Sequence, residues 1–284
     1  MSVVGEAARP EANGSAVPPR AARRARRWPG RILPVYTWLV ILYLVLPIMV
    51  MIAFGFNDTK SRLNLTWQGF TFHWYRDVFA NPALSAAFRN TLLVAVLTTA
   101  VATTLGTMLG LALGRYRFRG QGGVDLLIFA AISCPELVLG TALLSLFITL
   151  QVPRGLLTIL LAHIMFSVPF VAVTVRARMA GFDVSLEEAA QDLGADPWTT
   201  FRKVTLPLIF PGIMAGALLA FALSIDDYII TSFINGQTET FPIWVYGATR
   251  QGVPPQVNVL GTFLFLTGVG LAVANAVALR RRKL

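Results

Sequence analysis

Long apolar runs alternate with short polar connections along most of the chain. Six runs are long enough to cross a membrane as helices, and they cover approximately residues 32–56, 91–114, 126–150, 155–175, 208–234 and 257–279. Crossing a hydrocarbon core of ~30 Å takes about 20 helical residues. Because the membrane offers no water to unpaired backbone groups, each run predicts a helix. The pattern therefore predicts an all-α membrane protein with six transmembrane helices.

Composition and charge placement agree with that fold and suggest an orientation. Charged residues make up 13% of the chain, against about 25% in soluble proteins. The net charge of +10 would also suit nucleic-acid binding. However, 18 of the 24 Lys and Arg residues fall in the N-terminal tail, the C-terminus and the connections after the second and fourth runs. This bias predicts that both termini are cytoplasmic and makes a nucleic-acid partner unnecessary.

The first residues of the chain differ from the rest. Residues 1–30 are rich in Ala, Pro and Arg without periodicity, which predicts a disordered basic tail able to touch anionic membrane lipid. We expect the transmembrane domain over residues 31–284. Its single cysteine, Cys134, excludes an intramolecular disulfide and a multi-cysteine metal site.

The connection after the fourth run is polar and carries explicit helix signals. It includes SLEEAAQDLGADPWTTFRKVTLP at residues 185–207. Ser185 with Glu188 fits a capping box, and Gly194 stands where a helix would end in a left-handed residue. The connection therefore begins with a short helix.

A second short helix is predicted directly after the first. Asp196 can cap it, Pro197 suits its first position, and Pro207 is expected to end it before the next span. Such a helix pair can lie on the membrane surface. The first helix is acidic, however, and an anionic leaflet would repel it. Docking onto a protein partner fits better.

The residues of this connection match a known motif. EAA at 188–190, then Gly194, then VTLP at 204–207, resembles the EAA loop of permease subunits in bacterial ATP-binding cassette importers, with Val204 where the family has Ile. The resemblance implies that the loop docks onto a cytoplasmic ATPase subunit. The docking residues it implies are Glu187, Glu188, Ala189, Ala190, Asp192, Gly194, Leu206 and Pro207.

The resemblance extends from about the second run to the sixth. GFDVSLEEAAQDLGA, LSIDDYIITSFINGQ and GVPPQVNVLGT are most similar to permeases of the spermidine/putrescine importer group. This implies a type I importer-like fold in the bacterial inner membrane and alternating-access transport of polyamines. It also implies three kinds of partner, namely a second homologous permease, two ATPase subunits and an extracytoplasmic substrate-binding protein.

The chain itself has no signature of ATP hydrolysis. It lacks a G-x-x-x-x-G-K-[ST] phosphate loop. ATP and magnesium are therefore expected on the partner ATPase, with no cofactor, metal or catalytic residue in this chain.

Acidic residues interrupt two of the apolar runs. Each aspartate near a helix centre opposes membrane insertion by roughly 2.5–3.5 kcal/mol, so Asp226 and Asp227 should avoid lipid. In one continuous helix Asp227 shares a small or polar stripe with residues such as Ser224 and Thr231, whereas Asp226 lies on an apolar flank. We therefore expect Asp227 to face the substrate pathway, unless the stripe is an ordinary packing face.

A second acidic position lies in the third run. Glu136 follows Pro135, which predicts a break in the helix that can line a pathway. Aromatic residues, including Tyr246, can add cation–π contacts to an ammonium group. The full set of candidate pathway residues is Asp227, Asp226, Glu136, Ser224, Thr231, Tyr228 and Trp244. His163 is expected to be packed, and Gly106, Gly110 and Gly114 predict close approach of another helix.

Other functions remain open from the sequence. The permease could carry another small solute, such as an amino acid, a sugar or a metal complex. The acidic residues would also suit a secondary transporter driven by protons or sodium ions. A membrane regulatory protein is a third alternative, in which the acidic residues would be dispensable.

Overall fold

The computed structural model describes residues 32–61, 64–250 and 252–281. The predicted basic tail, residues 1–30, and the basic residues 282–283 lie outside this range. The chain divides into two compact units, Met1–Ile48 and Met49–Leu284.

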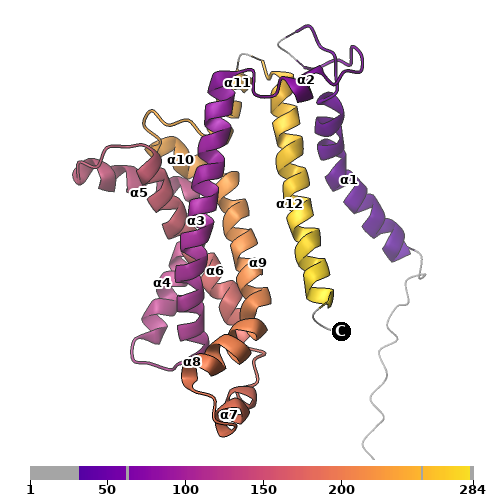
Figure 1. Ribbon diagram of the computed structural model, residues 1–284. Coiled ribbons are helices and arrows are strands. Elements are labelled where there is room, and N and C mark those ends of the chain that lie inside the picture. The colour runs from indigo at the N-terminus through magenta and orange to yellow at the C-terminus, as the bar shows by residue number, and fades with distance from the viewer. Residues whose placement is uncertain (1–31, 62–63, 251, 282–284) are drawn as a thin grey trace, which may run out of the picture. The chain divides into compact units, whose positions relative to one another are not determined.

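Helices form nearly all of the regular structure (Figure 1). They are α1 (Ile32–Phe54), α2 (His73–Arg76), α3 (Pro82–Arg115), α4 (Gln121–Ser133), α5 (Glu136–Thr149), α6 (Leu156–Met179), α7 (Ser185–Asp192), α8 (Pro197–Thr200), the π-helix η1 (Phe201–Thr205), α9 (Leu206–Ile225), α10 (Ile229–Ile234), α11 (Phe241–Thr249) and α12 (Pro255–Arg281). The described residues contain no strand beyond an isolated bridge between Asn57 and Phe70. Within the described ranges, five helices are long and apolar enough to span a membrane, or six if the bent pair α4 and α5 is one span. The predicted all-α membrane fold is confirmed.

Helix α1 begins in the first unit and is apolar on every side. It contains no charged residue, and none of its side chains is buried. A helix that is apolar all round fits a span that faces lipid.

The second unit is built around α3, α6 and α9, which pack along one another. The predicted close helix approach occurs at the glycines of α3. A Cβ atom on Gly106 would lie 2.6 Å from the Cβ of Val171, and one on Gly110 would lie 2.6 Å from the carbonyl oxygen of Ala172. Because these backbones nearly touch, α3 and α6 form a rigid pair.

Two helix boundaries differ from the predicted spans. Helix α3 begins at Pro82 rather than near residue 91, because the side chain of Asn81 accepts hydrogen bonds from the amides of Ala83 and Leu84. Pro207 does not end the helix that precedes it. Helices α8, η1 and α9 form a single span, Pro197–Ile225.

The π-turn explains how the chain tolerates Pro207. Proline lacks an N–H and collides with the carbonyl four residues back in a regular α-helix. In η1 the amide of Leu206 instead bonds the carbonyl of Phe201, five residues back. This wider turn keeps the helix continuous from the polar connection into the membrane.

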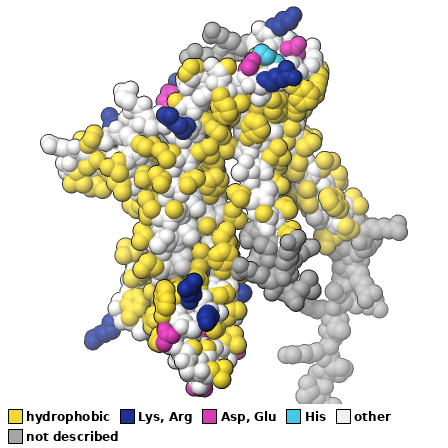
Figure 2. Space-filling model, viewed as in Figure 1, with side chains coloured by type: hydrophobic (Ala, Val, Ile, Leu, Met, Phe, Trp, Pro, Cys, Tyr) yellow, Lys and Arg dark blue, Asp and Glu magenta, His cyan; other side chains and the backbone are white. Residues whose placement is uncertain are grey.

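The surface of the second unit separates charge from apolar area. Figure 2 shows Lys, Arg, Asp and Glu side chains gathered at its two ends, with mostly hydrophobic surface between them. This distribution suits a protein whose middle lies in lipid and whose ends meet water.

Candidate functional site

Two breaks in the apolar helices lie close to each other. Helices α4 and α5 meet at Cys134–Pro135 with a bend of 105°, as the proline had predicted. Helices α9 and α10 are separated by Asp226, Asp227 and Tyr228. Helix α10 packs on α5, and a Cβ on Gly140 would lie only 2.6 Å from the ring of Phe233. The acidic residues predicted from different spans therefore share one region.

The prediction of an unbroken helix through residues 208–234 is wrong. Asp227 is the cause, because its carboxylate accepts hydrogen bonds from the amide of Thr231 at 2.8 Å and from that of Ile230 at 3.4 Å. These amides belong to the first turn of α10 and have no partner within the helix. The aspartate thus starts a new helix where apolar periodicity predicted a continuation.

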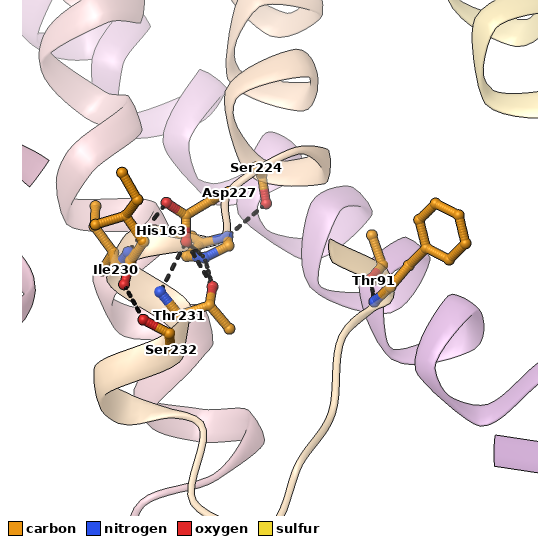
Figure 3. A network of polar contacts seen from close by, with 9 residues as sticks. Thr91, His163, Ser224, Asp227, Ile230, Thr231 and Ser232 are labelled. Atoms are coloured by element: carbon orange, nitrogen blue, oxygen red, sulfur yellow. Dashed lines mark hydrogen bonds and ion pairs between the residues drawn. The ribbon is translucent and has the colours of Figure 1, made fainter. Parts of the chain in front are cut away.

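The Asp227 carboxylate is held in a buried polar network (Figure 3). Its Oδ2 atom accepts the hydroxyl of Thr231 at 2.6 Å and lies 3.2 Å from Nε2 of His163. The other ring nitrogen of His163, Nδ1, lies 2.8 Å from the hydroxyl of Ser224. The side chains of His163 and Asp227 are only 3% and 5% exposed.

Both ring nitrogens of His163 have partners within this network. With the proton on Nε2, His163 can donate to Thr231 or Asp227, while Nδ1 accepts from Ser224. The network ties α6 to the end of α9 and the start of α10. His163 is packed as predicted, but its contact with Asp227 could not be predicted, since the two residues are 64 positions apart in the sequence.

The expected orientation of the aspartate pair is reversed. Ser224, Asp227 and Thr231 do gather on one side, but against α6 rather than toward open space. Asp226 is the exposed member of the pair. The packing-face alternative accounts for the stripe, because its small residues allow α6 to approach closely enough to bond the buried carboxylate.

Glu136 provides a second exposed carboxylate near the pair. It is the first residue of α5 and is exposed. A negative charge in a first helical turn is stabilised by the helix dipole. Helix α5 packs on α10, which directly follows the aspartate pair. Asp226 and Glu136 thus place two accessible carboxylates at the adjoining breaks.

Two of the aromatic candidates, Tyr228 and Tyr246, pack on each other. The ring of Tyr228 packs on that of Tyr246 at a centroid distance of 4.6 Å. The guanidinium of Arg250 lies 5.2 Å from the centroid of Tyr246. Tyr246 therefore already has a cationic partner from its own chain.

Trp244 belongs to another part of the molecule. It packs with Phe241 and Leu260 rather than with the residues around the breaks. It also lines a cavity of about 480 Å³ together with Glu239, a carboxylate that sequence reasoning did not single out.

The polar connection forms the predicted helix pair with different capping. Ser185 does not cap α7; Asp183 does, through its side chain and the amide of Ser185 at 3.0 Å. Hydrogen bonds from Ser185 hold the pKa of Asp183 below its usual range. Gly194 has a φ of +87°, and Asp196 caps α8 at the amides of Trp198 and Thr199, as predicted.

The predicted docking residues divide into exposed and buried groups. Those exposed on α7 and the turn after it are Glu188, Ala189, Asp192 and Gly194, while Ala190 is half-buried. Glu187 is the exception, since only 2% of its surface is exposed. Leu206 and Pro207 belong to the start of α9. Glu187 therefore does not present its carboxylate to a docking partner, because Arg115 and Thr205 bind it from inside the chain.

Apolar side chains beside the exposed acids favour a protein contact at this end. Leu193 is 90% exposed, and Leu186 and Trp198 are also exposed. Apolar side chains projecting from a short helix pair at the polar end of the molecule are typical of an interface.

Comparison with known proteins agrees with this architecture. A family model described as "Binding-protein-dependent transport system inner membrane component" matches residues 106–280. The spermidine/putrescine transport system permease protein PotC of Escherichia coli (strain K12) is 40% identical over 242 residues, which cover 85% of this chain and 91% of PotC. The putrescine transport system permease protein PotI of the same organism is 38% identical over 253 residues, covering 86% of this chain and 88% of PotI.

Solved structures show the same fold at lower sequence identity. A bacterial ABC transporter involved in the import of the acidic polysaccharide alginate has a chain that matches with a TM-score of 0.61 and 18% identity, covering 88% of this chain and 94% of that one. A structure of the alginate transporter in complex with a pentasaccharide-bound periplasmic protein matches with a TM-score of 0.64 and 15% identity, covering 88% and 92% of the two chains. The chain belongs to the family of binding-protein-dependent transport system inner membrane components, and it is a permease subunit of an ABC importer.

Proposed function

We propose that this permease imports polyamines, and that Asp226 and Glu136 supply carboxylates to the passing ammonium groups. The observation that carries the proposal is the exposure of both carboxylates at adjoining helix breaks within otherwise apolar spans. Ionisable residues at membrane depth are costly, and they are typical of substrate or ion routes. The printed functions of PotC and PotI, spermidine and putrescine transport, support the same substrate class.

Irregular backbone at this depth suits a transport pathway. Broken helices are tolerated within a membrane where they are buried in protein or line an aqueous cavity. Asp227 and His163 fix the α9–α10 break from the buried side, which leaves Asp226 on the other side. A linear polycation can then pass carboxylates in succession, whereas an anionic solute would be repelled.

The proposed assembly follows the family resemblance. A second homologous permease completes the pathway, two ATPase subunits dock at α7 and α8, and an extracytoplasmic binding protein delivers the amine. ATP and magnesium belong to the ATPase subunits, and this chain needs no cofactor. Both termini and α7 lie on the cytoplasmic side, which the excess of Lys and Arg in those segments supports.

The test is substrate-stimulated ATP hydrolysis and uptake by the complete complex with its binding protein, reconstituted in vesicles. We expect spermidine or putrescine to stimulate both, and amino acids and sugars to stimulate neither. Stimulation by one of those other solutes would overturn the substrate assignment. Uptake driven by a proton or sodium gradient without ATP would instead favour a secondary transporter.

A further inference from the structure

The buried carboxylate of Glu187 joins three elements at the polar end of the molecule. Arg115, the last residue of α3, donates a hydrogen bond from Nη1 to Oε1 at 2.8 Å, and its Nη2 atom forms an ion-pair contact with Oε2 at 2.6 Å. The hydroxyl of Thr205 in η1 donates to the same carboxylate. One side chain of α7 is thus bonded to the end of α3 and to η1, which continues into α9.

The geometry of this contact is unusually restrictive for a short helix. Each oxygen of the carboxylate contacts a different Nη atom of Arg115, and such a two-point contact restricts both distance and orientation. The side chain of Glu187 is 3% exposed and that of Arg115 is 37% exposed, so the carboxylate is the buried partner. Loss of Arg115 would leave this buried carboxylate without its counterion. Helix α7 is therefore held rigidly to the helix ends.

Both attached helices lead to functional parts of the permease. Helix α3 packs against α6 through Gly106 and Gly110 with almost no space between the backbones. The π-turn continues through α9 to the break at Asp226. A displacement of α7 can therefore be transmitted through α3 and α9 to the proposed amine site.

We propose that Arg115, Glu187 and Thr205 form a coupling strut that transmits movement of the docked ATPase into α3 and α9. This inference rests on the proposed docking of the ATPase at α7 and goes beyond it, because the three residues would act after docking. They are positioning residues, since they contact neither ATP nor the transported solute. The adjacent Glu188 contacts the ATPase subunit, while Glu187 carries the movement.

The key experiment measures how many amine molecules enter per ATP hydrolysed in the reconstituted complex. In Glu187→Gln we expect the ATPase subunits to stay bound while this ratio falls by roughly three- to thirtyfold, the range for residues that carry coupling. Thr205→Val removes one branch only and should have a smaller effect. Arg115→Glu and Glu187→Arg should each uncouple the complex, and the double variant should recover coupling at least in part.

Asp125 provides a matched control. Its carboxylate pairs with Arg176 to tie α4 to α6, and both side chains are more than a third exposed. Asp125→Asn removes an ion pair of the same type that does not involve α7, so the transport ratio should stay near wild type.

Three results would overturn the strut. They are an unchanged ratio in an assembled Glu187→Gln complex, no rescue by the charge swap, or loss of the ATPase subunits from Glu187→Gln as the sole defect. The proposed function fails separately, if the wild-type complex does not import amines with ATP. In that case the variants can still be compared with wild type by measuring how strongly the solute-loaded binding protein stimulates their ATP hydrolysis.

Discussion

Two pairs of adjacent acids occupy opposite ends of the same helical path, and each pair divides its roles in the same way. In α7, Glu187 is buried against Arg115 and Glu188 is exposed. At the α9–α10 break, Asp227 is buried against His163 and Asp226 is exposed. Neighbouring residues of α7 point about 100° apart, and at the break the two aspartates also differ in exposure. One member can therefore hold the fold while the other meets a partner.

The partners of the two buried acids differ in a way that suits their locations. Arg115 always carries a charge, and its guanidinium lies near water at the end of α3. His163 lies within a span, and both of its ring nitrogens have polar partners there. Hydroxyls of Thr231 and Ser224 supply the remaining hydrogen bonds. The same division of labour is thus built with a full ion pair at one end and a mainly hydrogen-bonded network at the other.

The largest expected effect comes from neutralising the exposed acids at the helix breaks. The double variant Asp226→Asn with Glu136→Gln should lower amine uptake by about ten- to hundredfold, since a hydrogen bond to a charged group contributes about 1.5–3 kcal/mol. Uptake rates at several amine concentrations would measure it. Asp58→Asn, at another exposed acid outside the spans, is the control. Normal uptake by the double variant would remove both residues from the pathway.

Neutralising the buried aspartate should affect stability more than transport chemistry. Asp227→Ala leaves His163 and the first amides of α10 without their partner, and we expect a loss of about 1–3 kcal/mol of unfolding free energy. Thermal unfolding of the purified complex would measure this. Asp227→Asn keeps an acceptor for the amide of Thr231 and should lose less. A fully stable Asp227→Ala protein with abolished uptake would restore Asp227 as the pathway residue.

Much of the fold was predictable because membrane helices follow simple rules. Apolar length identified the spans, Pro135 identified the α4–α5 break, and Gly106 with its equivalents predicted the close approach of another helix, which is α6. Each of these features depends on local sequence alone. The EAA spacing likewise located the exposed helix pair, because its signals lie within about 20 residues.

Features that depend on distant partners were not predictable in the same way. The stripe through Asp227 assumed one continuous helix, but a side chain that caps a new helix competes with apolar periodicity. The contact with His163 comes from another helix, as does that between Arg115 and Glu187. Periodicity can group residues on one side of a helix, but it does not tell whether that side meets a cavity or a neighbour.

A charge reversal at the exposed member of the α7 pair should weaken docking. Glu188→Lys is expected to reduce the affinity for the ATPase subunit by about five- to tenfold, as charge changes at an interface do when the buried core stays intact. Titration of the purified permease with the ATPase subunit would measure it. Glu188→Gln should have a smaller effect. Equal binding by wild type, Glu188→Lys and Glu188→Gln would exclude Glu188 from the interface. It would also weaken the comparison of the two acid pairs.

The smallest effect is expected at Gly194, which determines how α7 is followed by α8. Its φ is +87°, and a Cβ there would meet no atom within 4 Å, so substitution acts through backbone conformation alone. Valine in a left-handed conformation costs about 1–2 kcal/mol, part of which the exposed turn can relieve by shifting. We expect Gly194→Val to lower the affinity for the ATPase subunit by about threefold. Asparagine tolerates this conformation, so Gly194→Asn should bind nearly as well as wild type. If valine and asparagine weakened docking equally, the side chain itself would obstruct the partner, and Gly194 would belong to the interface rather than to its support.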